Sequence, residues 1–198
     1  MNWFVLFSIL LQCHQANPLA TPAMEPPATD FLILGGSERI GTAAATHILL
    51  RKPGSNVILA GRDNARGKEA VAEVIRECMQ RKAPADTASV EYVATRVSFR
   101  LLDWRDTASL KASVSECDCL IHTAGPYLNE KPLPLAVAIA SERCRAYVDV
   151  SDPLDYLGES LSMSNEASKS GTTALIAAGA FPGLSNGEFA LQFKFRSL

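Results

Sequence analysis

Short apolar runs alternate with segments of helical periodicity from residue 30 to about residue 177. Each run is four to six residues long, which is typical of strands buried on both faces. The segments between them repeat apolar residues every three or four positions, as one face of a helix does. Six such runs occur, at 31–34, 57–60, 97–102, 120–123, 147–150 and 173–177.

This alternation predicts one fold class. Parallel strands need a crossover between them, and right-handed helical crossovers cover both faces of the sheet. We therefore expect an α/β fold with a doubly wound, mostly parallel six-stranded sheet of the Rossmann type. Because ligands of such sheets bind at the carboxyl ends of the strands, functional residues are expected in the loops that follow the runs.

The helix pattern is clearest in three segments. It predicts helices at 40–51 and 132–143, the second almost wholly apolar. Asp152 is a good N-cap residue and Pro153 suits the first helical position, so a third helix is expected to begin there. One face of that helix carries Leu154, Leu157 and Leu161.

The pattern separates the first 29 residues from the rest of the chain. Residues 1–29 hold an apolar segment and a Pro/Ala-rich linker, and 30–182 hold a dinucleotide-binding domain. The apolar segment is too short to span a membrane, and no basic residue precedes Arg39, unlike in secretory or transit peptides. A cytoplasmic protein is expected, with organellar or secretory targeting through the apolar segment as the alternative.

Composition excludes several classes of function. The net charge of −2 gives no reason to expect a nucleic-acid partner. The five cysteines show neither a disulfide framework nor the spacing of zinc ligands, so no metal site is expected. His47, His122 and Cys144 fall on apolar faces and are interpreted as packed residues, which leaves the catalytic residues unknown.

The first run ends in a glycine-rich loop, FLILGGSERIG. Its candidate cofactor residues are Gly35, Gly36, Ser37, Glu38, Arg39, Ile40 and Gly41. A loop of this kind between strand and helix holds a pyrophosphate in the G-x-G-x-x-G fingerprint. The alternative is an ordinary strand-to-helix turn without a ligand.

Glu38 stands where the fingerprint has its middle glycine. A carboxylate there takes space from the pyrophosphate and repels it, so we expect a weakened cofactor site. The alternative is that Glu38 points to solvent, pairs with Arg39 and leaves its backbone N–H for the phosphate.

The second run ends in Gly61 and Arg62, where an NAD site usually has an acidic residue. An arginine at this place can pair with the 2′-phosphate of NADP, which favours NADP as the cofactor. The alternative is a surface arginine paired with Asp63. Asp103, after the third run, lies either near the adenine or at the N-cap of the next helix.

The fourth run leads into Ala124, Gly125 and Pro126, small residues that allow backbone to approach the nicotinamide side of a dinucleotide. Tyr127 and Lys131 spell the Y-x-x-x-K pair of short-chain dehydrogenases. We reject that match, because in those enzymes the pair lies on the helix after the fifth strand.

Together these motifs resemble the NADP-binding domain of the saccharopine dehydrogenase-like family. The matching segments are LGGSERIG, VILAGRD, DCLIHTAGPY, AYVDVSD and AGAFPGLSN. The resemblance implies an NADP-dependent oxidoreductase in which a second α+β domain supplies much of the substrate site. We expect 183–198 to be its truncated start, and the substrate is unknown.

Two functions follow as expectations. The first is an NADP-dependent oxidoreductase present here as its cofactor-binding domain and inactive alone. The second is a non-catalytic Rossmann module that acts as a dinucleotide sensor or an interaction protein. In either case, the face left uncovered, including the turn at 180–184, is expected to promote self-association.

Overall fold

Six strands form one parallel sheet in the spatial order β3-β2-β1-β4-β5-β6. The computed structural model describes residues 28–52, 54–81 and 90–179. The strands are β1 (Asp30–Leu34), β2 (Asn56–Gly61), β3 (Val97–Leu101), β4 (Cys119–His122), β5 (Ala146–Asp149) and β6 (Thr173–Leu175). The strand order reverses between β1 and β4, as in the doubly wound Rossmann arrangement, so the predicted fold class is confirmed.

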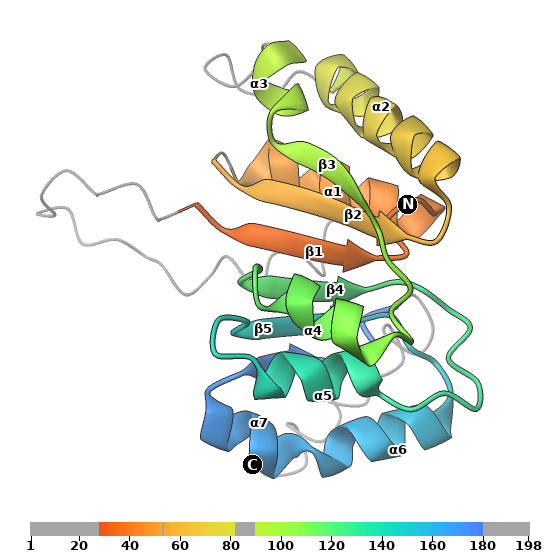
Figure 1. The fold of residues 1–198 in the computed structure, drawn as a ribbon, viewed down its shortest axis with the longest axis vertical. Coiled ribbons are helices and arrows are strands. Elements are labelled where there is room, and N and C mark those ends of the chain that lie inside the picture. The colour runs from red at the N-terminus through yellow and green to blue at the C-terminus, as the bar shows by residue number, and fades with distance from the viewer. Residues whose placement is uncertain (1–27, 53, 82–89, 180–198) are drawn as a thin grey trace, which may run out of the picture.

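Helices connect the strands and lie on the sheet (Figure 1). They are α1 (Arg39–Arg51), α2 (Asn64–Gln80), α3 (Val90–Ala94), α4 (Thr107–Val114), α5 (Leu133–Ala140), α6 (Leu154–Ser162) and α7 (Ser164–Ser170). Figure 1 shows α4 and α5 in front of β4 and β5, and α2 beside β3. Among the described residues, no helix combines the length and the hydropathy that crossing a bilayer requires.

Alternation within β1 sends its side chains into two separate cores. Leu32 and Leu34 join the core that includes Leu110 of α4 and Leu135 of α5. Ile33, between them, joins a second core with residues of α1 and α2. These three side chains are almost fully buried, and each contributes about 1.5–3 kcal/mol by leaving water. The central strand is therefore fixed from both faces, and the loop that follows it is held in place.

Two helices differ from their predicted form. The helix expected at 132–143 ends at Ala140, because Ser141 is extended and its hydroxyl accepts the N–H groups of Arg143 and Cys144. Asp152 does not cap α6, which begins at Leu154 with no side-chain cap. The leucine face of α6 is largely exposed (82% at Leu154), since the helix buries Tyr156 and Ser160 instead.

Two of the predicted segments, 1–29 and 183–198, lie wholly or largely outside the described residues. Residues 1–27 and 180–198 lie outside the described part of the chain, and both boundaries depend on them. The turn at 180–184, expected to contribute to self-association, lies there as well. The division at 29, at 182 and at 183 therefore stays a prediction.

Candidate functional site

The loops predicted to bind a cofactor meet at the carboxyl edge of the sheet. The backbone N–H of Gly36 donates to the carbonyl of Ala60, at the end of β2 (3.0 Å). The hydroxyl of Thr123, just after β4, donates to the carbonyl of Leu34 (2.8 Å). The loop after β1 is thereby joined to the loops after both neighbouring strands, which is the crevice position of a Rossmann sheet.

Three glycines of the loop are required by its geometry. Gly35 has a φ of 73°, which favours glycine. A Cβ on Gly36 would lie 2.7 Å from Cα of Leu59, and one on Gly41 would lie 2.5 Å from the Gly35 carbonyl oxygen. These contacts with backbone leave no room for a side chain. The glycine pattern therefore has a packing reason in this chain, whether or not a ligand binds.

Helix α1 begins at the far end of the same loop. Glu38 is its N-cap residue, with an extended backbone and no side-chain cap hydrogen bond. Its carbonyl accepts the N–H of Thr42, and its own N–H donates to the Gly35 carbonyl (3.0 Å). The N–H groups of the first helical turn point out of the helix end, which favours an anion there. The N–H of Glu38 itself is used within the turn, contrary to the alternative considered from sequence.

The side chain of Glu38 pairs with Arg66, not with its neighbour Arg39. Oε1 of Glu38 lies 3.0 Å from Nη2 of Arg66, in the first turn of α2. Sequence reasoning missed Arg66. The signal that could have identified it is Asp63, because an Asp at the N-cap places the residue three positions later in the first turn, beside the glycine loop.

The end of β2 lies against the glycine loop. A Cβ on Gly61 would lie 3.2 Å from the Ser37 hydroxyl, so this glycine allows Ser37 its position. Arg62 is exposed and forms no ion pair with any described residue. Asp63, the partner considered for Arg62, instead caps α2 by accepting the N–H groups of Ala65 and Arg66 (2.9 and 3.2 Å). Arg62 is therefore available to an anion at this edge.

The loop after β3 places Asp103 at the same edge but not at a helix cap. Its carboxylate accepts the N–H of Arg105 (3.1 Å) in a turn. Asp106 is the N-cap of α4 and accepts the N–H of Ala108. Of the two sequence alternatives for Asp103, the N-cap is wrong.

The loop after β4 brings Ala124 against the glycine loop and carries Gly125 and Pro126 on the surface. Tyr127, which follows, is buried and donates its hydroxyl to the carbonyl of His122 (2.7 Å). Lys131 is exposed and pairs with Glu159. Tyr127 and Lys131 thus interact with other groups, in agreement with the rejection of a Y-x-x-x-K dyad.

Beneath this edge lies a buried aromatic cluster that the sequence did not predict. The His122 ring packs edge-on between Trp104 (centroids 5.1 Å apart) and Tyr127 (4.9 Å). Tyr127 in turn packs against Tyr156 of α6. The rings come from two loops, one strand and one helix, so they join the segments that support the site. His122 is packed, as predicted.

His122 should make stability depend on pH. Burial, with a smaller contribution from Arg105, lowers its pKa from 6.5 to about 3, and neither ring nitrogen has a hydrogen-bond partner among the described residues. As pH drops, His122 is protonated in the unfolded chain before it is protonated in the folded one. The free energy of unfolding is therefore highest above pH 6.5 and falls below it. One pKa unit is worth about 1.4 kcal/mol, so urea unfolding at pH 5 should show a loss of about 2 kcal/mol. A flat profile between pH 6.5 and 5 would contradict this, and His122→Leu should flatten the slope.

A buried carboxylate fixes the next part of the edge. Asp149, at the end of β5, is 0% exposed. One of its oxygens accepts the N–H and hydroxyl of Ser151 (3.1 and 2.7 Å) and the N–H of Ala177 (2.9 Å). The other accepts the hydroxyl of Tyr147 (3.0 Å). Asp149 therefore holds the loop after β5 against the segment after β6, where Ala177 has a φ of 57°.

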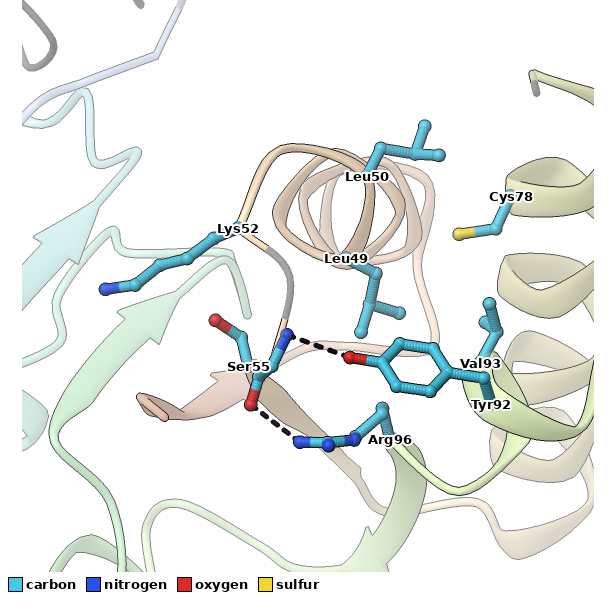
Figure 2. A pocket seen from close by; sticks show the side chains of 9 residues that line it. Leu49, Leu50, Lys52, Ser55, Cys78, Tyr92, Val93 and Arg96 are labelled. Atoms are coloured by element: carbon cyan, nitrogen blue, oxygen red, sulfur yellow. Dashed lines mark hydrogen bonds between the residues drawn. The ribbon is translucent and has the colours of Figure 1, made fainter. Parts of the chain in front are cut away.

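A small cavity at the opposite edge of the sheet is structural. Figure 2 shows Tyr92 and Arg96 directed at the turn before β2, where they bind the N–H and the carbonyl of Gly54 (3.1 and 2.7 Å). Its volume of ≈ 10 Å³ has room for about one water molecule. It lies at the amino ends of the strands, away from the glycine loop. Within the described residues, no cluster of His, Cys, Asp or Glu could hold a metal ion.

The fold is shared with known dehydrogenases. Saccharopine dehydrogenase (L-Glu forming) from Saccharomyces cerevisiae superposes with a TM-score of 0.55 at 20% identity, over 80% of this chain and 29% of that enzyme. A short-chain type dehydrogenase/reductase from Mycobacterium ulcerans superposes with a TM-score of 0.52 at 14% identity, over 74% and 65% of the two chains. No family model and no curated protein matches the sequence.

The sheet order, the glycine loop and these neighbours define the fold. The chain has a Rossmann-like α/β fold of the kind found in dehydrogenases and reductases. It spans less than a third of the yeast enzyme (29%).

Proposed function

We propose that the chain is the cofactor-binding domain of an NADP-dependent oxidoreductase of the saccharopine dehydrogenase-like type, and that it has no turnover alone. The observation that carries this proposal is that the glycine loop, the start of α1 and Arg62 all lie at the carboxyl edge of the sheet, where Arg62 forms no ion pair with any described residue. Backbone N–H groups at a helix start favour phosphate, and an arginine at the end of β2 can pair with a second phosphate.

Each candidate residue then has a role. Gly35, Gly36 and Ser37, together with the first turn Arg39–Ile40–Gly41, would hold the pyrophosphate through backbone. Arg62 would bind the 2′-phosphate, with Gly61 leaving space for the ribose. Asp103 would lie near the adenine. The segment Ala124–Gly125–Pro126 would lie along the nicotinamide, and hydride transfer at that ring is the chemistry the cofactor supplies.

We propose that a second domain supplies the substrate site and the catalytic residues. The chain covers 29% of the yeast enzyme, and we infer that another domain completes the crevice. Leu154, Leu161 and Leu175 are large exposed apolar residues near the end of the described chain. In the isolated chain they would favour self-association.

The proposed cofactor preference can be measured directly. Arg62→Ala should weaken NADPH binding by about 1.5–3 kcal/mol, the range for a charge-assisted contact, and leave NADH binding nearly unchanged. Titration of nicotinamide fluorescence with both cofactors checks this. Equal affinities for NADH and NADPH in the unmodified protein would contradict the preference for NADP, and binding of neither would contradict the function.

The alternative function is a dinucleotide sensor without catalysis. It is favoured by the engagement of Tyr127 and Lys131 with other groups, which leaves the described residues without the Y-x-x-x-K pair. An assay of NADPH oxidation with candidate carbonyl and imine substrates distinguishes the two. Binding without turnover by the chain joined to its second domain would favour the sensor.

A further inference from the structure

Glu38 and Arg66 join the two elements that flank the proposed phosphate site. Glu38 ends the glycine loop, and Arg66 lies in the first turn of α2. A single guanidinium nitrogen of Arg66 contacts both carboxylate oxygens, at 3.0 and 3.1 Å. A cation beside the loop is therefore already bound to an anion of the chain itself.

The pair lines an open depression of ≈ 260 Å³ between α1 and α2. Its lining residues are Ser37, Glu38, Arg39, Thr42, Arg66, Glu69, Ala70 and Glu73. Two arginines face three glutamates there, so the formal charge of the lining is −1. Without the charge of Glu38 the formal charge of the lining would be zero. Removing this one carboxylate would therefore neutralise the lining.

The pair is weak enough to exchange. The side chains of Arg66 and Glu38 are 56% and 54% exposed. Exposed ion pairs change an equilibrium constant by at most about fivefold. A phosphate monoester has up to two negative charges and three acceptor oxygens, so it makes stronger hydrogen bonds with a guanidinium than one carboxylate does.

We propose that the Glu38–Arg66 pair is a gate for the 2′-phosphate of the cofactor. In the free protein, Glu38 occupies Arg66. When a 2′-phosphorylated nucleotide binds, Arg66 leaves the carboxylate and joins Arg62 on the phosphate. The gate rests on the proposed NADP binding and adds to it: Arg66 becomes a second specificity-determining residue, and Glu38 becomes its internal competitor.

The test compares NADPH with NADH, which lacks the 2′-phosphate. Repulsion of the pyrophosphate by Glu38 affects both nucleotides and cancels in the ratio of their dissociation constants. The ratio is measured by fluorescence titration for the full chain and for Glu38→Gln, Arg66→Gln and the double variant. Arg81→Gln is the matched control, because Arg81 follows the same helix and pairs with Glu77 far from the loop.

We expect the preference for NADPH to fall by about tenfold or more in Arg66→Gln, as for loss of a charge-assisted contact. It should rise by about two- to fivefold in Glu38→Gln. When Arg66→Gln is already present, Glu38→Gln should not raise the preference for NADPH. Arg81→Gln should leave the preference unchanged, since it removes the same charge at a distance.

Two results would overturn the gate while leaving the proposed function intact. One is NADPH preference that is unaffected by Arg66→Gln. The other is an equal gain from Glu38→Gln with and without Arg66, which would mean direct repulsion of the 2′-phosphate instead of competition for a partner. Absence of binding of either nucleotide to all of these proteins would overturn the proposed function and the gate together.

Discussion

Replacing Glu38 by glycine should tighten NADPH binding at least tenfold. The substitution restores the middle glycine of the fingerprint and removes both the bulk and the charge of the side chain from the loop. Two unit charges about 4 Å apart repel by roughly 1 kcal/mol in water and roughly 4 kcal/mol at a dielectric constant of about 20. A half-exposed loop lies between these values, which corresponds to a gain of about ten- to a thousandfold.

The ion pair with Arg66 moderates that gain. Because Arg66 lies 3.0 Å from the carboxylate, it already cancels part of the repulsion. The helix start favours an anion by only about 0.3–1 kcal/mol, too little to offset a full charge. The gain from glycine should exceed that from Glu38→Gln, since glutamine keeps the bulk of the side chain.

Titration of NADPH at low and high salt measures the gain in affinity and the part of it that is electrostatic. The electrostatic part should shrink as salt rises, because the loop is exposed. Glycine is tolerated at an N-cap, so thermal unfolding should change little and serves as the control for folding. An unchanged affinity would mean that Glu38 lies out of the way of the cofactor and that the loop is not weakened.

Asp149→Ala should lower the free energy of unfolding by about 3–5 kcal/mol, the size of effect seen when a buried polar network is broken. Asp149 is fully buried and accepts four hydrogen bonds, three of them on one oxygen. Alanine would leave these donors buried without their acceptor. Since domains of this size are stable by only about 5–15 kcal/mol, the variant should be close to unfolding at physiological temperature.

Urea denaturation of the purified chain checks this, with Asp152→Ala as the matched control. Asp152 lies three residues further on and is exposed, so its loss should cost less than about 0.5 kcal/mol. Asp149→Asn should have a smaller effect than Asp149→Ala, because its amide oxygen keeps one acceptor. If Asp149→Ala and Asp152→Ala have similar stability, Asp149 does not hold the loop after β5 against the segment after β6.

The sheet could be predicted because its signal is local. Each apolar run lies on a strand, within a residue or two at its ends, and the runs of the central strands β1, β2 and β4 lie between two core layers, so four or five neighbouring residues are enough to indicate a strand. The ends of helices depend on single side chains. The Ser141 hydroxyl accepts two backbone N–H groups that would otherwise continue the helix. The apolar pattern does not indicate this hydrogen bonding.

The candidate site could be predicted only in part. The glycine loop is a short motif whose spacing is visible in sequence, and Arg62 follows directly from the end of β2. Arg66 was missed because its partner Glu38 lies 28 positions away, and the Asp149 network was missed because one of its partners, Ala177, also lies 28 positions away. A pairing across that distance depends on how helices and loops lie in space, which no local pattern encodes.

The position of β1 has a consequence for biosynthesis. β1 is the first described strand to be synthesised, yet it lies in the middle of the sheet, between β2 and β4. The N–H of Asp30 binds the carboxylate of Asp118, 88 residues later. At about 5–20 residues per second, the ribosome needs roughly 4–18 s to supply that second neighbour.

During this interval, β1 can pair with β2 but not with β4. The side of β1 that later pairs with β4 is then an open strand edge, which can pair with other chains. Leu32 and Leu34 also lack the helices α4 and α5 that later cover them. A central strand of the finished sheet is therefore an exposed edge for several seconds of its own translation.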